Sequence, residues 1–282
     1  MKKFQEKVAV ITGAASGIGY AIVERCVKEG MKVVLADIEE VELTQTEKAL
    51  KSRGANILTV QTDVSKAKDV EALAQKTLDA YGAVHLLFNN AGVNVYGTIW
   101  ERTLADWQWV IGVNLWGVIH GVRVFVPIML QQNTEGHIVN TASIAGLISG
   151  PRMGIYKVTK HGVVSLSETL YHELALAGSK IKVSVLCPAF VQTRITDSVR
   201  TRPAELQTGP MQDKRDSEYE KEEQFMRRKV QEGMSPNQVA SCVFDAIIHE
   251  KFYILTHLES KDRVRIRMEN ILLERNPTEW EY

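Results

Sequence analysis

Short apolar runs recur along the chain, separated by stretches with helical spacing. Runs such as Val8-Ala9-Val10-Ile11 are apolar at every position, which is typical of strands buried on both faces of a parallel sheet. Between the runs, apolar residues recur every three or four positions, most clearly in 70–81. Alternating strands and helices with right-handed crossovers predict a doubly wound α/β fold, a parallel sheet of about seven strands with helices on both faces. The predicted strands are 8–11, 33–36, 57–58, 86–88, 138–139, 183–187 and 252–255.

The length and composition fit one large domain, and the balanced net charge gives no general attraction to a highly charged partner. Of the 282 residues, 45% are hydrophobic and 24% are charged, as in folded globular proteins. The 34 basic and 34 acidic residues cancel, so no general attraction to nucleic acid or to an anionic membrane is expected. The polar N-terminus lacks the apolar stretch of a signal peptide, and no run reaches the roughly 18 apolar residues of a membrane span. We therefore expect a cytoplasmic protein.

Cysteine and histidine spacing gives no sign of a metal or redox centre. Cys26, Cys187 and Cys242 are far apart and form no Cys-x-x-Cys pair, so we expect them to be buried, reduced thiols. The seven histidines show no metal-ligand spacing, and no metal is expected.

A glycine-rich turn follows the first strand and leads directly into a helix. It reads Thr-Gly-Ala-Ala-Ser-Gly-Ile-Gly over 12–19. Gly13 permits a tight turn, Gly17 lets backbone N–H groups approach a pyrophosphate, and Gly19 allows the helix to pack closely on the strand. The helix N-terminus adds partial positive charge. The turn predicts a dinucleotide phosphate site, to which Ser16 and Ile18 also contribute.

Asp37 ends the second predicted strand, 18 residues after Gly19. A carboxylate there can accept hydrogen bonds from the ribose diol of an adenosine. It would repel a 2′-phosphate, and neither Ser16 nor Ile38 is a cation that could offset the repulsion. The sequence therefore favours NAD over NADP. Capping of the next helix is the alternative role for Asp37.

Five motifs, in this order, resemble those of the short-chain dehydrogenase/reductases. The resemblance covers about residues 6–195, and Ser143 precedes Tyr156 by 13 residues as the family pattern requires. It implies a Rossmann-like single domain, a nicotinamide cofactor, and a homodimer or homotetramer built partly from helices around 106–129 and 155–177. The motifs are the glycine turn, Asn89-Asn90-Ala91-Gly92, Asn114, Ser143 and Tyr156-Lys157-Val158-Thr159-Lys160.

The resemblance implies a role for each catalytic residue. Tyr156 is the acid/base, and Lys160, four residues later on the same helix face, binds the nicotinamide ribose. A phenol needs about 4 kcal/mol of preferential phenolate stabilisation to reach a pKa of 7, and a fixed ammonium can supply much of it. Ser143 holds the substrate oxygen, and Asn114 supports a water-linked proton path from Lys160.

Further cofactor contacts follow from the same resemblance. Asp63 and Val64 would meet the adenine, and Thr193 the nicotinamide carboxamide. The family commonly has Pro-Gly where this chain has Pro188-Ala189, and alanine resists a positive φ. The remaining expected contacts are Asn90, Ala91, Gly92, Tyr156, Lys160, Pro188 and Val191.

The expected substrate pocket is mostly apolar. It comprises 93–96, 144–146, 151–153 and 190–191, and predicts an apolar to mid-sized secondary alcohol or ketone as substrate. We interpret Arg152 as a surface charge in preference to a carboxylate-binding group. Sugar-nucleotide epimerases share the Tyr and Lys but differ in glycine spacing. A nucleotide-sensing interaction protein of the same fold, without turnover, is the alternative from another functional class.

A charged segment interrupts the strand-helix pattern near the C-terminus. Residues 200–232 hold eight basic and eight acidic residues, broken by Pro203 and by Gly209-Pro210. Tyr219, Met226 and Val230 are spaced seven and four apart, which predicts a charged helix with a thin apolar stripe. We expect 194–234 to be either a substrate lid or a solvated surface excursion, followed by a helix over 236–250 and a C-terminal extension at 258–282.

Overall fold

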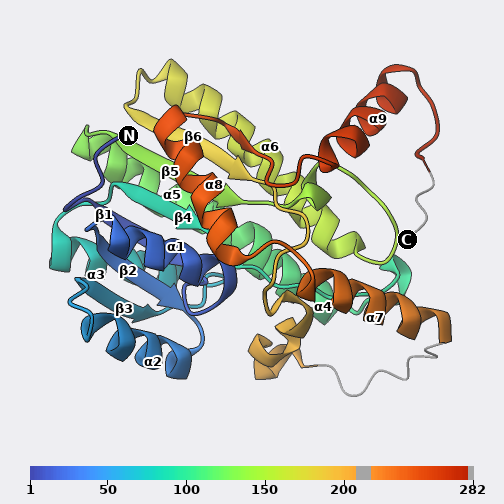
Figure 1. The fold of residues 1–282 in the computed structure, drawn as a ribbon, viewed down its shortest axis with the longest axis horizontal. Helices are drawn as coiled ribbons and strands as arrows, with labels where there is room; N and C mark the ends of the chain where they lie inside the picture. Colours follow the sequence, from blue (N-terminus) through green and yellow to red (C-terminus); the bar gives the residue numbers. More distant parts are fainter. Residues whose placement is uncertain (208–216, 279–282) are drawn as a thin grey trace.

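Seven parallel strands form the central sheet of the structure, a computed structural model that describes residues 1–207 and 217–278 (Figure 1). The strand order is β3-β2-β1-β4-β5-β6-β7, so the winding direction reverses between β1 and β4. Ligands of doubly wound sheets bind beyond the carboxyl ends at such a reversal. The prediction of a doubly wound parallel sheet is confirmed. The strands are Val8–Thr12, Lys32–Asp37, Ile57–Gln61, Leu86–Asn89, Gly136–Thr141, Ile181–Leu186 and Tyr253–Ile254.

Helices cover both faces of this sheet. On one face lie α1 (Gly17–Lys28), α2 (Glu40–Lys51) and α8 (Pro236–His249), whose buried side chains share one core cluster. On the other lie α3 (Ala67–Tyr81), α5 (Gly117–Gln132) and α6 (Gly154–Leu176). The remaining elements are η1 (Ile99–Glu101), α4 (Leu104–Ile111), the π-helical η2 (Gly112–Trp116), η3 (Ile144–Gly146), η4 (Ile195–Thr201), η5 (Ala204–Leu206), α7 (Ser217–Gln231) and α9 (Ser260–Leu272).

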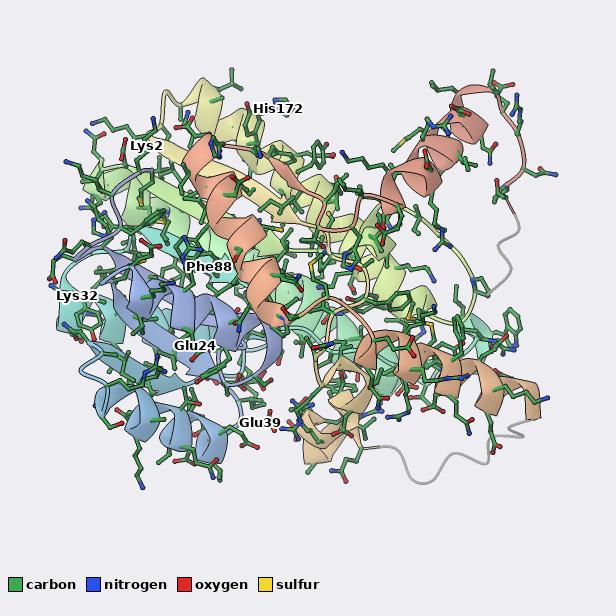
Figure 2. The ribbon with its side chains drawn as sticks, in the orientation of Figure 1. Lys2, Glu24, Lys32, Glu39, Phe88 and His172 are labelled. Atoms are coloured by element: carbon green, nitrogen blue, oxygen red, sulfur yellow. The ribbon has the colours of Figure 1, made fainter. Side chains whose placement is uncertain are left out.

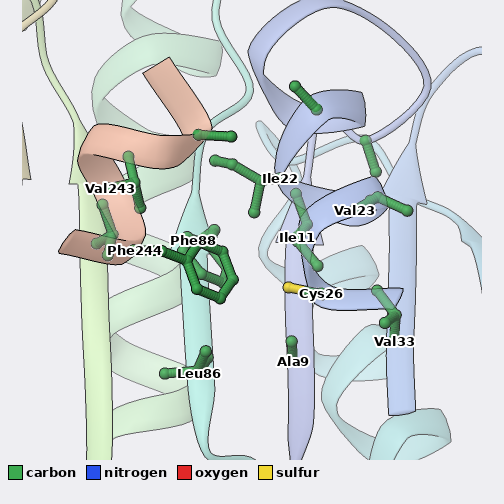
Figure 3. Packing of buried hydrophobic residues seen from close by; sticks show 14 of the residues in the cluster. Ala9, Ile11, Ile22, Val23, Cys26, Val33, Leu86, Phe88, Val243 and Phe244 are labelled. Atoms are coloured by element: carbon green, nitrogen blue, oxygen red, sulfur yellow. The ribbon is translucent and has the colours of Figure 1, made fainter. Parts of the chain in front are cut away.

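The core beneath α1 and α8 shows why these segments pack on the sheet. Ile22 and Cys26, one helical turn apart on α1, are fully buried and point towards Ile11 of β1 (Figure 3). Phe88 of β4 stacks on Phe244 of α8, with ring centroids 6.5 Å apart. Full burial of a large apolar side chain contributes about 1.5–3 kcal/mol, so this spacing drives each helix onto the strands.

The helical stretch Leu104–Gln132 is long and apolar enough to cross a membrane by length and composition, and 44% of its most apolar window is buried inside the protein. It comprises α4, η2 and α5, and α5 packs against α3 and β4. Packing in the interior of this fold accounts for the buried part of the stretch.

The C-terminal third adds η4, η5, α7 and α9 beyond the carboxyl ends of the strands, and α7 and α9 lie apart from each other in Figure 1. The predicted charged helix is present as α7, with Val230 buried and Met226 half-buried. Residues 208–216 of the predicted insertion and the side chain of Tyr219 lie outside the described residues. The helix predicted over 236–250 is confirmed as α8. Cys26 and Cys187 are buried free thiols as predicted, but Cys242 is only half-buried and packs against the edge of the core beneath α8.

Candidate active site

A cleft of about 1140 Å³ opens at the carboxyl end of the sheet. Ligand pockets usually have volumes of about 300–1,000 Å³, so this cleft has room for a dinucleotide and a second small molecule. Two predicted residues, Gly19 and Asn114, do not line it and lie behind its wall. The predicted residues that do line it are Gly13, Ser16, Gly17, Ile18, Asp37, Asp63, Val64, Asn90, Ala91, Gly92, Ser143, Tyr156, Lys160, Pro188, Val191 and Thr193.

The glycine turn needs glycine for two different reasons. Gly13 and Gly17 have φ of +64° and +56°, a conformation that L side chains rarely adopt. A Cβ on Gly19 would overlap the carbonyl oxygen of Gly13. Ser16, the N-cap of α1, is extended and makes no capping hydrogen bond through its side chain. The first N–H groups of the helix therefore remain available to an anion at the cleft floor.

Asn90, the residue after β4, holds the glycine turn in place through hydrogen bonds. Its side-chain amide donates to the carbonyl oxygens of Thr12 and Gly13, at 3.0 and 3.3 Å. The backbone N–H groups of Asn90 and Ala91 both donate to the hydroxyl of Thr12, at 2.9 and 3.1 Å. Asn90 therefore joins the first and fourth strands at the point where the sheet order reverses.

Asp37, at the end of β2, lines the cleft and is 8% exposed. One carboxylate oxygen accepts the N–H of Ala15 at 2.9 Å, and the other accepts the N–H of Glu39 at 3.1 Å. Burial raises the pKa of Asp37, and these two hydrogen bonds oppose that shift. The N-cap of α2 is Glu39, so Asp37 supports the preceding turn instead of capping the helix itself.

The other predicted adenine and carboxamide contacts occupy the cleft wall. Asp63 accepts both the N–H and the hydroxyl of Ser65, at 3.0 and 2.6 Å, and is 3.3 Å from the Lys66 ammonium. Thr193 lies against Gly17, because a Cβ on that glycine would come 3.0 Å from its methyl group. The turn after β3 and the loop after β6 therefore flank the glycine turn.

Tyr156 and Lys160 lie one turn apart on α6 and face the cleft together. The ammonium nitrogen of Lys160 is 5.4 Å from the centroid of the Tyr156 ring and donates to the carbonyl oxygen of Thr141 at 2.8 Å. Ser143, after β5, donates its hydroxyl to the carbonyl oxygen of Pro188 at 3.3 Å and accepts the N–H of Ala145 at 3.1 Å. The three side chains are brought together from two segments of the chain.

Burial is the largest influence on the pKa values of Tyr156 and Lys160. It raises the pKa of Tyr156 to about 12, and the hydrogen bond from Ser143 acts in the opposite direction. Burial lowers the pKa of Lys160 to about 8. The sequence-based expectation was a lowered Tyr156 pKa. The structure gives a raised pKa instead. Removing the phenolate from water destabilises it by more than the hydrogen bond from Ser143 stabilises it.

Asn114 lies in the π-helical turn between α4 and α5 and is fully buried. Its carbonyl oxygen accepts the N–H of Val93 at 2.8 Å, and its amide donates to the Val93 carbonyl at 2.9 Å and the Thr159 hydroxyl at 3.3 Å. A Cβ on Gly92 would lie 3.5 Å from the Asn114 oxygen and 3.6 Å from the Lys160 ammonium, so both groups flank Gly92. In this structure, Asn114 holds the loop after β4 against α6.

Pattern reasoning missed His257, which follows β7 and lines the cleft. Its Nδ1 accepts the N–H of Ala189 at 3.3 Å, and its Nε2 is 3.1 Å from the carbonyl oxygen of Phe190. Ala189 has no positive φ, so alanine fits where the family commonly has glycine. The partner of Ala189 is 68 residues away, and no local spacing could have indicated it.

Ion pairs join the charged segment to the rest of the cleft. Arg200 of η4 binds Glu39 through Nε at 3.2 Å and Nη2 at 2.9 Å. Arg202 pairs with the buried carboxylate of Asp106 at 2.6 Å. Sequence reasoning found no cation near Asp37, but the fold brings Arg200 next to Glu39 from 161 residues away.

Two expectations about the substrate pocket need correction. Arg152 is not a free surface charge: it pairs with Glu222 of α7 at 2.8 Å, and both side chains are 21% exposed. Arg152 and Gly146 do not line the cleft, although their neighbours do. Among the described residues, no group of three His, Cys, Asp or Glu side chains could hold a metal ion.

Comparisons with known proteins agree with this geometry. Residues 7–204 match the short chain dehydrogenase family. The chain is 36% identical over 278 residues to a CLA biosynthesis dehydrogenase/reductase of Lactiplantibacillus plantarum, covering 98% of this chain and 97% of that protein. It is also 36% identical over 193 residues to a diacetyl reductase [(S)-acetoin forming] of Staphylococcus epidermidis, covering 68% and 74%.

Solved structures give the same result. A short-chain dehydrogenase/reductase from Burkholderia phymatum, crystallised in complex with NAD, is 50% identical and superposes with a TM-score of 0.96 over all of both chains. The apo form of LigD from Sphingobium superposes with a TM-score of 0.78 at 26% identity, over 98% and 100% of the two chains. The glycine turn, the strand order and these matches show that the chain belongs to the short-chain dehydrogenase/reductase family.

Proposed function

We propose that the protein is an NAD-dependent oxidoreductase that interconverts a secondary alcohol and a ketone. The observation that carries this proposal is the position of Tyr156 and Lys160, which face a cleft whose other end is formed by the glycine turn and Asp37. The match to an NAD complex at 50% identity supports the choice of cofactor. The diacetyl reductase among the relatives supports carbonyl chemistry.

The residues present fit a dinucleotide. The N–H groups at the start of α1 and the side-chain-free surface of Gly13 and Gly17 suit a pyrophosphate. The Asp37 carboxylate suits a ribose diol, and Asn90, Pro188, Val191 and Thr193 line the way to Tyr156. A bound NAD supplies the hydride acceptor, or NADH the donor, for the carbinol carbon.

Tyr156 is the proposed acid/base. In alcohol oxidation its phenolate accepts the hydroxyl proton, and in ketone reduction its phenol returns a proton to the oxygen. The Lys160 ammonium stabilises the phenolate and binds the nicotinamide ribose. The Ser143 hydroxyl donates to the substrate oxygen in place of the long 3.3 Å bond to Pro188. Asn114 acts by holding the loop that contains Gly92 beside Lys160.

The substrate end of the cleft favours an apolar or mid-sized molecule. Val95, Met153 and Phe190 line it together with Ile195 and Leu206. We propose that 194–207 and 217–234 cover this end, because Arg202 and Glu222 anchor them to α4 and to the loop before α6.

We also propose a cytoplasmic homodimer or homotetramer, assembled partly through α4, α5 and α6. Leu104 on α4, Val158 on α6 and Trp116 at the end of η2, directly before α5, are exposed large apolar side chains. Light scattering of the purified protein would give two or four times the mass of 31.6 kDa, and a monomer at micromolar concentration would contradict this assignment.

A spectrophotometric screen tests the function. Secondary alcohols are offered with NAD and NADP, and ketones with NADH and NADPH, while the absorbance of the reduced nicotinamide is followed. Turnover of at least one apolar substrate with NAD(H) supports the proposal. NADH binding without turnover of any substrate would instead favour the nucleotide-sensing protein.

A further inference from the structure

We propose that Glu39 is a second determinant of cofactor choice, and that it acts by holding Arg200, a latent ligand for a 2′-phosphate. The inference rests on the proposed NAD function and concerns how this chain excludes NADP. Asp37 alone would oppose a 2′-phosphate with only one negative charge. The structure adds an acidic residue two positions later and a cation from η4, and all three line the same cleft wall.

Every nitrogen of the Arg200 guanidinium is engaged. Nε and Nη2 bind the two carboxylate oxygens of Glu39, at 3.2 and 2.9 Å. Nη1 donates to the backbone carbonyls of Asp197 at 2.9 Å and Arg194 at 3.3 Å. The side chains of Arg200 and Glu39 are 21% and 15% exposed, so the pair is only weakly screened by solvent. A fork-to-fork pair of this kind is geometrically specific as well as charge-assisted.

Glu39 is coupled to Asp37 through the backbone. The N–H of Glu39 donates to Asp37 at 3.1 Å, while its side chain points towards the segment formed by η4 and η5 (Figure 2). The Arg200 guanidinium is therefore held by a residue two positions after the carboxylate that we expect to bind the ribose diol, and all three side chains line the same cleft. Arginine forks bind phosphate in the same bidentate manner as carboxylate.

Glu39 therefore determines whether Arg200 is available to bind a 2′-phosphate. With Glu39 present, a 2′-phosphate would have to displace a carboxylate from Arg200 and would then face two acidic groups. Without Glu39, Nε and Nη2 of the same guanidinium are free to donate to an anion in the cleft that Asp37 also lines. By binding Arg200, Glu39 occupies a side chain that could bind phosphate and joins η4 to the start of α2.

Binding affinities of a variant series test the proposal without any turnover. The series is Asp37→Ser, Asp37→Ser/Glu39→Gln, and Asp37→Ser/Glu39→Gln/Arg200→Gln. Asp37→Ser/Glu40→Gln is the matched control, because Glu40 is the adjacent, exposed acid and its carboxylate makes no ion pair among the described residues. Dissociation constants for NADH and NADPH are measured by nucleotide fluorescence, and circular dichroism checks that each variant is folded.

We expect Glu39→Gln to improve NADPH affinity at least about tenfold over Asp37→Ser, as a new charge-assisted pair would. Glu40→Gln should change it less than about threefold, since an exposed charge contributes little. The added Arg200→Gln should abolish the gain. An equal gain from Glu39→Gln and Glu40→Gln, or a gain that survives Arg200→Gln, would overturn the proposal. The second result would point to Arg194, which also lines this wall.

Two single variants provide a second test in case the double and triple variants do not fold. Glu39→Gln and Glu40→Gln, with Asp37 retained, are titrated calorimetrically with adenosine 2′,5′-bisphosphate and with ADP. The ratio of the two affinities should shift towards the bisphosphate in Glu39→Gln only, and an unchanged ratio would refute the role of Glu39. If the wild type binds neither NADH nor ADP, the proposed NAD function fails first, so the two failures are distinguishable.

Discussion

The Asp37 carboxylate accepts a hydrogen bond from the backbone N–H of Ala15 at 2.9 Å, which joins the end of β2 to the glycine turn after β1. The residue expected to bind the ribose therefore also shapes the glycine turn that we propose binds the pyrophosphate. A second bond, from the N–H of Glu39, fixes the other carboxylate oxygen. Asp37 is thus oriented before any ligand binds, which reduces the ordering cost of binding.

Asp37→Asn separates the charge of this residue from its structural role. The amide oxygen can still accept the N–H of Ala15, but the amide nitrogen cannot accept the N–H of Glu39, so the melting temperature should fall by about 2–4 °C, as expected for one lost hydrogen bond. Loss of the charge should weaken NADH binding by about tenfold, as expected for a charge-assisted hydrogen bond made neutral. Fluorescence titration of NADH measures the effect, with Asp79→Asn on the exposed side of α3 as control. Unchanged NADH affinity would mean that Asp37 does not contact the ribose.

The raised pKa of Tyr156 predicts a pH dependence with opposite signs in the two directions. Oxidation needs the phenolate, and a pKa of about 12 leaves little phenolate at neutral pH, so the oxidation rate should rise with pH between 6 and 8, where the Lys160 ammonium, with a pKa of about 8, still stabilises it. Reduction needs the phenol and should stay nearly constant between pH 6 and 8. Initial rates measured in both directions at saturating cofactor check this. An oxidation rate that levels off below pH 7 would contradict the raised pKa of Tyr156.

His257 should position the loop after β6. His257→Phe removes both the acceptor for Ala189 and the group next to the Phe190 carbonyl. Because Pro188 in the same loop contacts Ser143, we expect kcat/KM to fall by about tenfold, on the order of one lost hydrogen bond. His257→Asn retains an acceptor near Nδ1 and should restore most of the KM for NADH. Equal kinetics of His257→Phe and His257→Asn would show that the imidazole only fills space.

The sequence predicted the parts of the site that local patterns determine. The turn at 12–19 and the pair Tyr156 and Lys160 depend on residues a few positions apart, and they lie where expected. Glu39 with Arg200, and Ala189 with His257, are contacts between segments 161 and 68 residues apart. Such contacts depend on how loops fold over the sheet, which hydrophobic periodicity does not specify. The direction of the Tyr156 pKa was missed because burial cannot be judged from spacing.

Buried histidines predict acid instability. His137, next to Ser184 at 2.7 Å, has its pKa lowered to about 3 by burial, whereas an unfolded chain has the ordinary value near 6.5. The neutral ring therefore contributes stability above pH 6.5, which is lost as the pH falls towards 3, by about 1.4 kcal/mol per pH unit for each proton. His137→Gln should reduce this slope. Part of the slope should remain, because His85 also has a lowered pKa, of about 4.

Urea unfolding between pH 4.5 and 7 measures that slope. His172→Gln is the control, because His172 lies at the surface (Figure 2). A wild-type free energy of unfolding that does not fall over this range, or an equal reduction of the slope by both variants, would contradict the assignment to His137.

The most direct test of the account compares Tyr156→Phe with the wild type in two measurements on the same samples. One is NADH binding by fluorescence, and the other is turnover of the best alcohol found in the screen with NAD. Phenylalanine keeps the ring and removes only the acid/base group, so we expect NADH affinity within about twofold and a loss of kcat of about 10²–10⁴-fold. Full turnover by Tyr156→Phe would show that another group transfers the proton.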